Sequence, residues 1–291
     1  MDWFYNFPDM SRSNLRDFKK SVDFPFTDFS RTYGETIESF FEPLLMFLVW
    51  FEKFFINTPW PLIVIGILLL AWVGSRSLVV VLGTFISFML IGYFGMWEDT
   101  MSTLAIILVA TFLCISIGIP LGIAMARSNK IQAFVVPILD IMQTIPSFVY
   151  LIPVVMLFGV GLTPGVVATI IFALPPIVRL TNIGIRQVGK GFKEAGASLG
   201  LTKFKILHRI EIPLAMKTIM AGVNQTLMLA LSMVVIAALI GAGGLGLTVY
   251  VALGRLDIGG AVIGGTGIVI LAIVLDRITQ KIIPQDTIKT R

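Results

Sequence analysis

Long apolar runs without charged residues dominate the chain from residue 54 onward, and short charged or polar stretches separate them. A helix needs about 20 apolar residues to cross the hydrocarbon core of a bilayer. Four runs suit single helices, whereas 141–178 and 218–254 are too long for one crossing. The first divides at the glycine- and proline-containing stretch 161–165, and the second leaves a glycine-rich segment after about residue 240. The pattern predicts an all-α membrane protein with about seven transmembrane helices, at 59–73, 77–97, 100–126, on either side of 161–165, at 218–240 and at 258–275.

Composition supports a membrane protein over a soluble one. Of the 291 residues, 56% are hydrophobic and 13% are charged, whereas soluble domains average about 25% charged residues. A soluble globule of this composition would expose too much apolar surface. The single cysteine, Cys114, and the single histidine, His208, exclude an intrachain disulfide and a multi-His or Cys/His zinc site.

The distribution of Lys and Arg predicts the orientation. These residues concentrate on the cytoplasmic side of membrane proteins. If the hydrophilic loop 179–217 is cytoplasmic, 15 of the 16 Lys and Arg residues from Arg76 onward lie inside, and only Arg255 lies outside. We therefore expect a multi-pass membrane protein with its amino terminus outside and its carboxyl terminus in the cytoplasm.

Residues 1–57 form an expected amino-terminal tail on the outer side of the membrane. An early apolar run is absent from residues 1–35, so we expect targeting by an uncleaved membrane segment. Farther along, apolar residues recur at helical spacing and predict an amphipathic helix on the outer membrane surface. A helix packed on the bundle, or an eighth and poorer span that would move the amino terminus inside, are the alternatives. The helical positions are Ile37, Phe40, Phe41, Leu44, Leu45, Leu48 and Phe51.

The remaining organisation follows from the apolar runs. We expect two additional transmembrane helices in 58–97, a five-helix core in 98–282 that contains the loop 179–217, and a short cytoplasmic tail in 283–291.

The loop 179–217 carries the most informative set of residues. Its members are Glu194, Ala195, Gly196, Gly200, Ile210, Ile212 and Pro213. Their spacing resembles the E-A-A, three residues, G, nine residues, I-x-L-P motif of ABC importer permeases. Two letters differ, since Gly196 replaces alanine and Ile212 replaces leucine. The resemblance implies that Glu194 and the helix around it dock on a nucleotide-binding subunit.

Physical reasoning fits a coupling element. A short helix over 193–199 would act as a rigid lever, and its small residues Ala195 and Gly196 would allow close approach to a groove on the ATPase. Gly200 permits a tight turn, and Pro213 would fix the start of the sixth span. Glu194 near the helix start would suit the positive end of the helix dipole. An ordinary basic loop on lipid headgroups is the alternative.

A wider resemblance covers about residues 100–282. The segments 142–153, 172–180, 220–233 and 267–277 are similar to the permease family of glycine betaine and proline betaine uptake systems; residues 1–57 are not matched. The family resemblance implies a type I ABC importer permease fold in the bacterial inner membrane, with the tail 1–57 in the periplasm. It also implies a second copy of the chain, two ATPase subunits and a periplasmic substrate-binding protein. Glycine betaine or proline betaine is the implied substrate, and choline, carnitine or an N-oxide osmolyte stay open.

Two glycine patterns have simpler explanations. The stretch 241–246 satisfies G-x-G-x-x-G, but a dinucleotide site needs a preceding strand. Gly260 and Gly264 suit close helix packing. The chain contains no P-loop sequence. We therefore expect no cofactor on this chain, ATP and magnesium on a partner ATPase, and no nucleic-acid partner.

Four polar residues in apolar runs are candidates for the transport pathway: Asp140, Gln143, Asn224 and Gln225. Asp140 has two interpretations. We favour a position near the inner interface, where it would hydrogen-bond backbone groups left unpaired by Pro137 or Pro146; the alternative is that it lines the pathway. Polar groups such as Asn224 usually bond across helices. An ion-driven secondary transporter is the rival class, but it would need more intramembrane charges than Asp140 alone.

Overall fold

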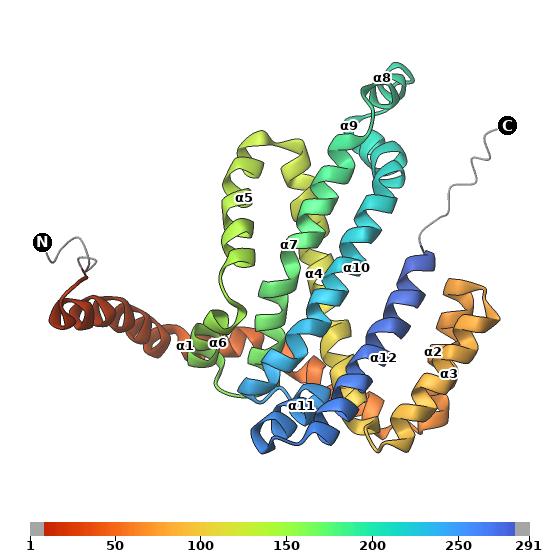
Figure 1. Cartoon of the computed structure of the whole chain (residues 1–291). Helices are drawn as coiled ribbons and strands as arrows, with labels where there is room; N and C mark the ends of the chain where they lie inside the picture. The colour runs from red at the N-terminus through yellow and green to blue at the C-terminus, as the bar shows by residue number, and fades with distance from the viewer. Residues whose placement is uncertain (1–8, 283–291) are drawn as a thin grey trace, which may run out of the picture.

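The computed structural model describes residues 9–282, and within that range the chain is helical without a strand (Figure 1). The predicted tail 283–291 lies outside the described residues. The elements are α1 (Arg12–Asn57), α2 (Trp60–Ser75), α3 (Leu78–Tyr93), α4 (Trp97–Arg127), α5 (Asn129–Thr144), α6 (Ser147–Phe158), α7 (Leu162–Gln187), α8 (Lys190–Ser198), α9 (Lys203–Ile206), a π-helical turn (Leu207–Glu211), α10 (Ile212–Ala237), a 3-10 turn (Ala238–Ile240), α11 (Gly244–Arg255) and α12 (Ile258–Ile282). The all-α prediction is confirmed.

Helices α4, α7 and α10 form the centre of the bundle because small residues let their backbones approach. A Cβ atom on Gly118 of α4 would lie 2.4 Å from Cγ2 of Ile177 in α7. One on Gly122 would lie 2.7 Å from the carbonyl oxygen of Val178. On α10, Gly222 faces Ile177 from the other side. These contacts fix the helices that carry the loop between α7 and α10.

Four described helical segments are long and apolar enough to cross a membrane: α4, α7, the continuous segment Lys203–Ile240, and Ile258–Thr279 of α12. Two bent pairs, α1 with α2 and α5 with α6, raise the number to six if each pair is one span. The expectation of about seven transmembrane helices included one over 77–97, but α3, the helix in that segment, has only 16 residues. The apolar runs are helical, but not all of them have spanning length.

Helix α1 packs against the side of the bundle. It meets α2 at an angle of 105°, and α1 alone is not among the four spanning helices. Leu48 is buried against Ile106 and Val109 of α4. Toward its amino-terminal end, α1 extends away from the other helices (Figure 1). The helix predicted over 37–51 therefore exists as part of a longer one that packs on the bundle; its position on the membrane surface stays a prediction.

Three boundaries differ from the sequence expectations. The helix predicted to begin at 141 begins at Asn129 as α5, and the chain then turns by 101° into α6. Pro146 causes this break, because the residue before a proline, Ile145, adopts extended backbone. In addition, α7 continues through Gln187, so the predicted loop 179–217 contains the end of a helix.

The glycine-rich segment after residue 240 contains an unpredicted helix, α11. It forms a hairpin with α12, in which Gly264 lies against Val249, as the close-packing interpretation of Gly260 and Gly264 predicts. The backbone N–H of Leu245 donates to Oγ1 of Thr103 on α4, at 2.8 Å. Residues 241–246 join helices within the described chain, without the strand that a dinucleotide site requires.

Candidate energy-coupling site

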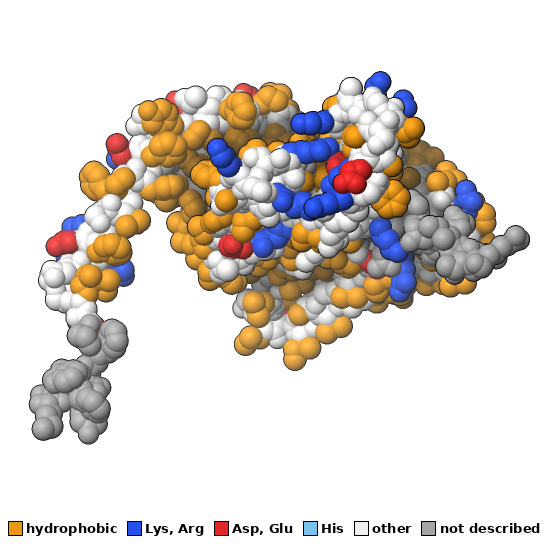
Figure 2. Space-filling model, turned by 90° about the horizontal axis from the view of Figure 1, so that it is seen from above, with side chains coloured by type: hydrophobic (Ala, Val, Ile, Leu, Met, Phe, Trp, Pro, Cys, Tyr) orange, Lys and Arg blue, Asp and Glu red, His pale blue; other side chains and the backbone are white. Residues whose placement is uncertain are grey.

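Helix α8 projects from the end of the bundle at which α4 ends and α5 begins (Figure 1). It packs mainly on α9 and on the π-helical turn. Figure 2, which views this end, shows Lys and Arg side chains gathered around a few acidic ones. Three large apolar side chains near α8 are exposed, namely Phe192, Leu199 and Phe204. Exposed apolar groups on a charged, projecting element indicate a docking surface.

Gly200 ends α8 in the predicted turn. Its φ angle is +75°, which glycine adopts without strain. The N–H of Gly200 donates to the carbonyl of Ala197 at 2.9 Å, and the N–H of Leu201 donates to the carbonyl of Gly196 at 3.1 Å. This pair of bonds is a Schellman motif. It directs the chain back toward the bundle.

Gly196 faces the bundle, which corrects the expectation that it faces a partner. It is the only buried residue of α8. A Cβ atom at this position would lie 2.6 Å from Cδ1 of Ile210 and 3.3 Å from Cγ1 of Ile206. The spacing between Gly196 and Ile210 therefore serves packing within the chain. Ala195 and Ala197 are exposed and remain available to a partner.

Glu194 is exposed, as a docking residue must be, but the expectation that it interacts with the positive end of the helix dipole is wrong. Because α8 begins at Lys190, Glu194 lies beyond the first helical turn, where the helix dipole has little effect. Among the described residues, its carboxylate makes no ion pair or side-chain hydrogen bond. The charge is thus free for an external partner.

Pro213 does not begin a new helix. The helix runs continuously from Lys203 to Ile240, and a π-helical turn precedes α10. The N–H of Ile212 bonds to the carbonyl of Leu207, five residues earlier. Widening the turn in this way accommodates a proline that lacks an N–H and would crowd an α-helical carbonyl. Residues near α8 are therefore joined to the bundle centre by one helix.

A buried carboxylate beneath α8 was not identified from the sequence. The side chain of Glu211 is 1% exposed and pairs with Arg127, the last residue of α4, and with Lys193 of α8. The distance from Nζ of Lys193 to Oε1 of Glu211 is 3.2 Å. Glu211 occupies the variable position of the I-x-L-P pattern. The sequence feature that could have indicated its burial is an acidic residue between the apolar residues Ile210 and Ile212.

A third cation, Arg186, fixes the same end of the bundle. Nη2 of Arg186 on α7 donates to the carbonyl of Met125 at 2.7 Å and to Oδ1 of Asn129 at 2.9 Å. Arg186 therefore joins α7 to the turn between α4 and α5.

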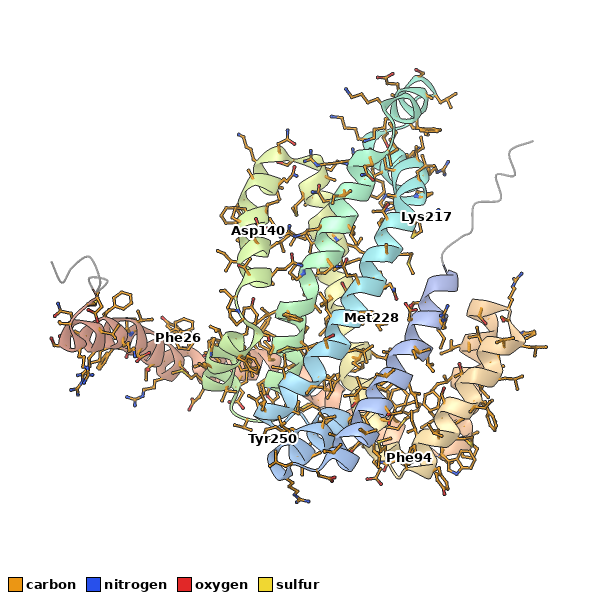
Figure 3. All side chains as sticks on the ribbon, in the orientation of Figure 1. Phe26, Phe94, Asp140, Lys217, Met228 and Tyr250 are labelled. Carbon is orange, nitrogen blue, oxygen red and sulfur yellow. The ribbon has the colours of Figure 1, made fainter. Side chains whose placement is uncertain are left out.

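The pathway candidates do not converge on one site. Asp140 lies part-way along α5 (Figure 3), and its Oδ1 pairs with Nη2 of Arg179 on α7 at 2.5 Å. The expectation that its carboxylate bonds freed backbone is wrong. Asn224 instead joins α10 to α12, donating to Asp276 and accepting from Thr279, both at 2.9 Å.

Two further candidates, Gln143 and Gln225, are exposed. Among residues 9–282, no group of three or more His, Cys, Asp or Glu side chains is placed to hold a metal ion.

Comparisons with known proteins agree with this architecture. Residues 118–288 match the family described as binding-protein-dependent transport system inner membrane component. The chain is 53% identical over 232 residues to the glycine betaine/proline betaine transport system permease protein ProW of Escherichia coli, covering 80% of this chain and 65% of that protein. It is 48% identical to the glycine betaine/carnitine transport permease protein GbuB of Listeria monocytogenes, covering 76% of this chain and 79% of that protein.

A third relative, the Salmonella typhimurium ProW protein, is 58% identical over 69% of this chain and 57% of its own length. The chain thus spans less than two thirds of either ProW protein.

A solved structure has the same fold. The inward-facing MetNI methionine ABC transporter matches with a TM-score of 0.55 and 24% identity, covering 64% of this chain and 91% of that one. The fold is that of a type I ABC importer permease, a multi-pass membrane protein, and the chain belongs to the family of binding-protein-dependent transport system inner membrane components.

Proposed function

We propose that this chain is the membrane-spanning subunit of an ATP-driven importer and that a separate ATPase docks on α8. The observation that carries the proposal is the geometry of α8, an exposed helix with a free carboxylate at Glu194 and its one buried residue against the bundle. An ATPase can bind the exposed face of such a helix while its buried face stays packed on the bundle. ATP and magnesium then bind on the ATPase, and this chain holds no cofactor.

Transport follows from moving α8. Two copies of the chain form the channel, and two ATPase subunits close on ATP. Their motion displaces α8, and the continuous helix Lys203–Ile240 carries the displacement into the bundle. A periplasmic substrate-binding protein delivers the cargo at the opposite end. Hydrolysis resets the inward-open state.

The orientation belongs to the same proposal. The α8 end faces the cytoplasm, since it gathers Lys and Arg side chains (Figure 2). The amino-terminal segment then lies outside and the carboxyl terminus inside.

The proposed substrate is a small methylated zwitterion such as glycine betaine or proline betaine. The names of the ProW and GbuB proteins support this class. The alternatives are carnitine, which the GbuB name also contains, trimethylamine N-oxide, which appears in the name of another relative, and choline. Aromatic cages suited to a quaternary ammonium group would lie in the binding protein.

Reconstitution tests the proposal. The chain, its ATPase and its binding protein are placed in liposomes, and ATP hydrolysis and uptake are measured with each osmolyte. We expect Glu194→Lys to lower co-purification of the ATPase at least about tenfold, because it reverses a charge in the docking surface. Glu98→Lys, the same change at an exposed residue of the opposite end, is the matched control. Normal uptake by Glu194→Lys contradicts docking at α8.

The ion pair of Asp140 and Arg179 favours one rival, a transporter driven by an ion gradient. Gradient-driven uptake by the purified chain without an ATPase would establish that rival and overturn the proposal.

A further inference from the structure

The attachment of α8 to the membrane helices rests on few side chains. Gly196 is its only buried residue, and the helix packs mainly on α9 and the π-helical turn. A lever transmits force only through the contacts that resist its displacement. The groups that join α8 to the bundle therefore decide whether its motion reaches the membrane helices.

Both oxygens of the Glu211 carboxylate are engaged, by cations from different elements. One oxygen pairs with Arg127 at the end of α4, and Oε1 lies 3.2 Å from Nζ of Lys193 on α8. The same Nζ donates to the carbonyl of Ile185 on α7, at 3.4 Å. A single carboxylate with its two cations thus links α8 to α4, α7 and the helix that continues into α10.

Burial makes this link firm. A carboxylate that is 1% exposed has lost its hydration, so leaving it without a cation is costly. Arg127 and Lys193 are 40% and 33% exposed, and each could turn to water if Glu211 released it. The desolvated anion is the member that cannot relax, and it holds the two cations in place.

We propose that Glu211, with Lys193 and Arg127, is the brace that passes displacement of α8 into α4 and α7. Glu211 and Lys193 are positioning residues for energy coupling, distinct from the residues that touch the ATPase. The inference rests on the proposed function for its role in transport, but the brace itself can be tested without it.

The transport test removes one cation. In the reconstituted complex, Lys193→Met is expected to leave ATPase co-purification unchanged. The ATP consumed per substrate imported should rise about tenfold, which is the change expected from losing one charged hydrogen bond. Lys190→Met is the matched control, because Lys190 lies on the same helix and makes no ion pair among the described residues. Loss of ATPase binding in Lys193→Met would assign Lys193 to the docking surface and overturn the brace.

A second readout needs neither ATPase nor substrate. In the full chain in lipid nanodiscs, hydrogen exchange of the α8 amides should be about tenfold faster in Lys193→Met than in Lys190→Met, because α8 opens more often. Exchange within α4 should not change. This comparison remains decisive even if reconstituted wild-type chain shows no ATP-driven uptake, which would refute the proposed function alone.

The two residues must also act together. If the brace is one unit, Lys193→Met has no further effect on α8 exchange once Glu211→Gln has removed the charge. Additive effects of the two substitutions, or wild-type exchange in Lys193→Met, would overturn the proposal.

Discussion

At the residue scale, Gly196 and Gly200 suit their positions for different physical reasons. Gly200 has a positive φ angle and open space around it, so only its backbone conformation demands glycine. A Cβ atom on Gly196 would meet the side chains of Ile210 and Ile206, so its small volume lets α8 pack closely without a shift of these side chains. The sequence motif could predict the turn at Gly200. The direction in which Gly196 points depends on where the helix packs, and its spacing alone does not reveal that.

Gly200→Ala isolates the effect of the turn. A left-handed conformation costs an alanine about 1 to 2 kcal/mol, and no atom lies within 4 Å of the added methyl. We expect faster hydrogen exchange at the end of α8. Gly191→Ala is the matched control, since it lies inside the same helix with equal space, and alanine stabilises a helix by about 1 kcal/mol relative to glycine. The two variants should shift exchange in opposite directions, and equal shifts would contradict this explanation.

The ion pair of Asp140 and Arg179 gives a prediction about stability. Replacing Asp140 by Asn leaves the Arg179 cation without its partner at a bundle face. The expected loss is about 1 kcal/mol, below that for a fully buried pair because the Asp140 side chain is 54% exposed. Thermal unfolding in detergent measures it. The double variant Asp140→Asn with Arg179→Gln should recover part of the loss; a double variant worse than both single ones would show that the charges act separately.

At the element scale, apolar length predicted most helices but not their ends. The fourth predicted span has the wrong start because Asp140, which ended the charge-free run, lies within α5, and Pro146 bends the helix in mid-run. Helix α11 was missed because glycine lowers helix propensity. Tertiary contacts stabilise α11 instead: Thr103 of α4 accepts a hydrogen bond from its backbone, and its own Val249 packs against Gly264 of α12. Such tertiary contacts are not readable from local composition.

The contact between α4 and α7 predicts which glycines of the bundle are irreplaceable. Gly122→Val should destabilise the chain by about 1 to 3 kcal/mol, because its Cβ would lie 2.7 Å from a backbone carbonyl that cannot move aside. Gly83→Val on α3 is the control, with no atom within 4 Å. Thermal unfolding followed by size-exclusion chromatography compares them. A similar loss in both variants would mean that valine, and not the contact, is responsible.

At the scale of the whole molecule, the charge pattern predicts which ends of the helices lie together. The end of α4, the start of α5 and the segment α8–α9 meet at one end, as the alternation of spans requires (Figure 1). The placement of α1 could not be predicted in this way. Its apolar stripe fits a lipid surface as well as a protein one, and only tertiary contacts, such as Leu48 against α4 and Phe41 against Phe158 of α6, show that it packs on the bundle.

Labelling in sealed cells tests the orientation of the whole bundle. With Cys114→Ala as the background, His208→Cys reports on the α8 end and Ile258→Cys on the opposite end; both native side chains are exposed. If the basic end faces the cytoplasm, as proposed, an impermeant maleimide added outside should modify Ile258→Cys and spare His208→Cys. Inside-out vesicles should reverse the result. Labelling of His208→Cys from outside would place α8 away from any cytoplasmic ATPase, and α8 could then not pass the energy of ATP hydrolysis to the bundle.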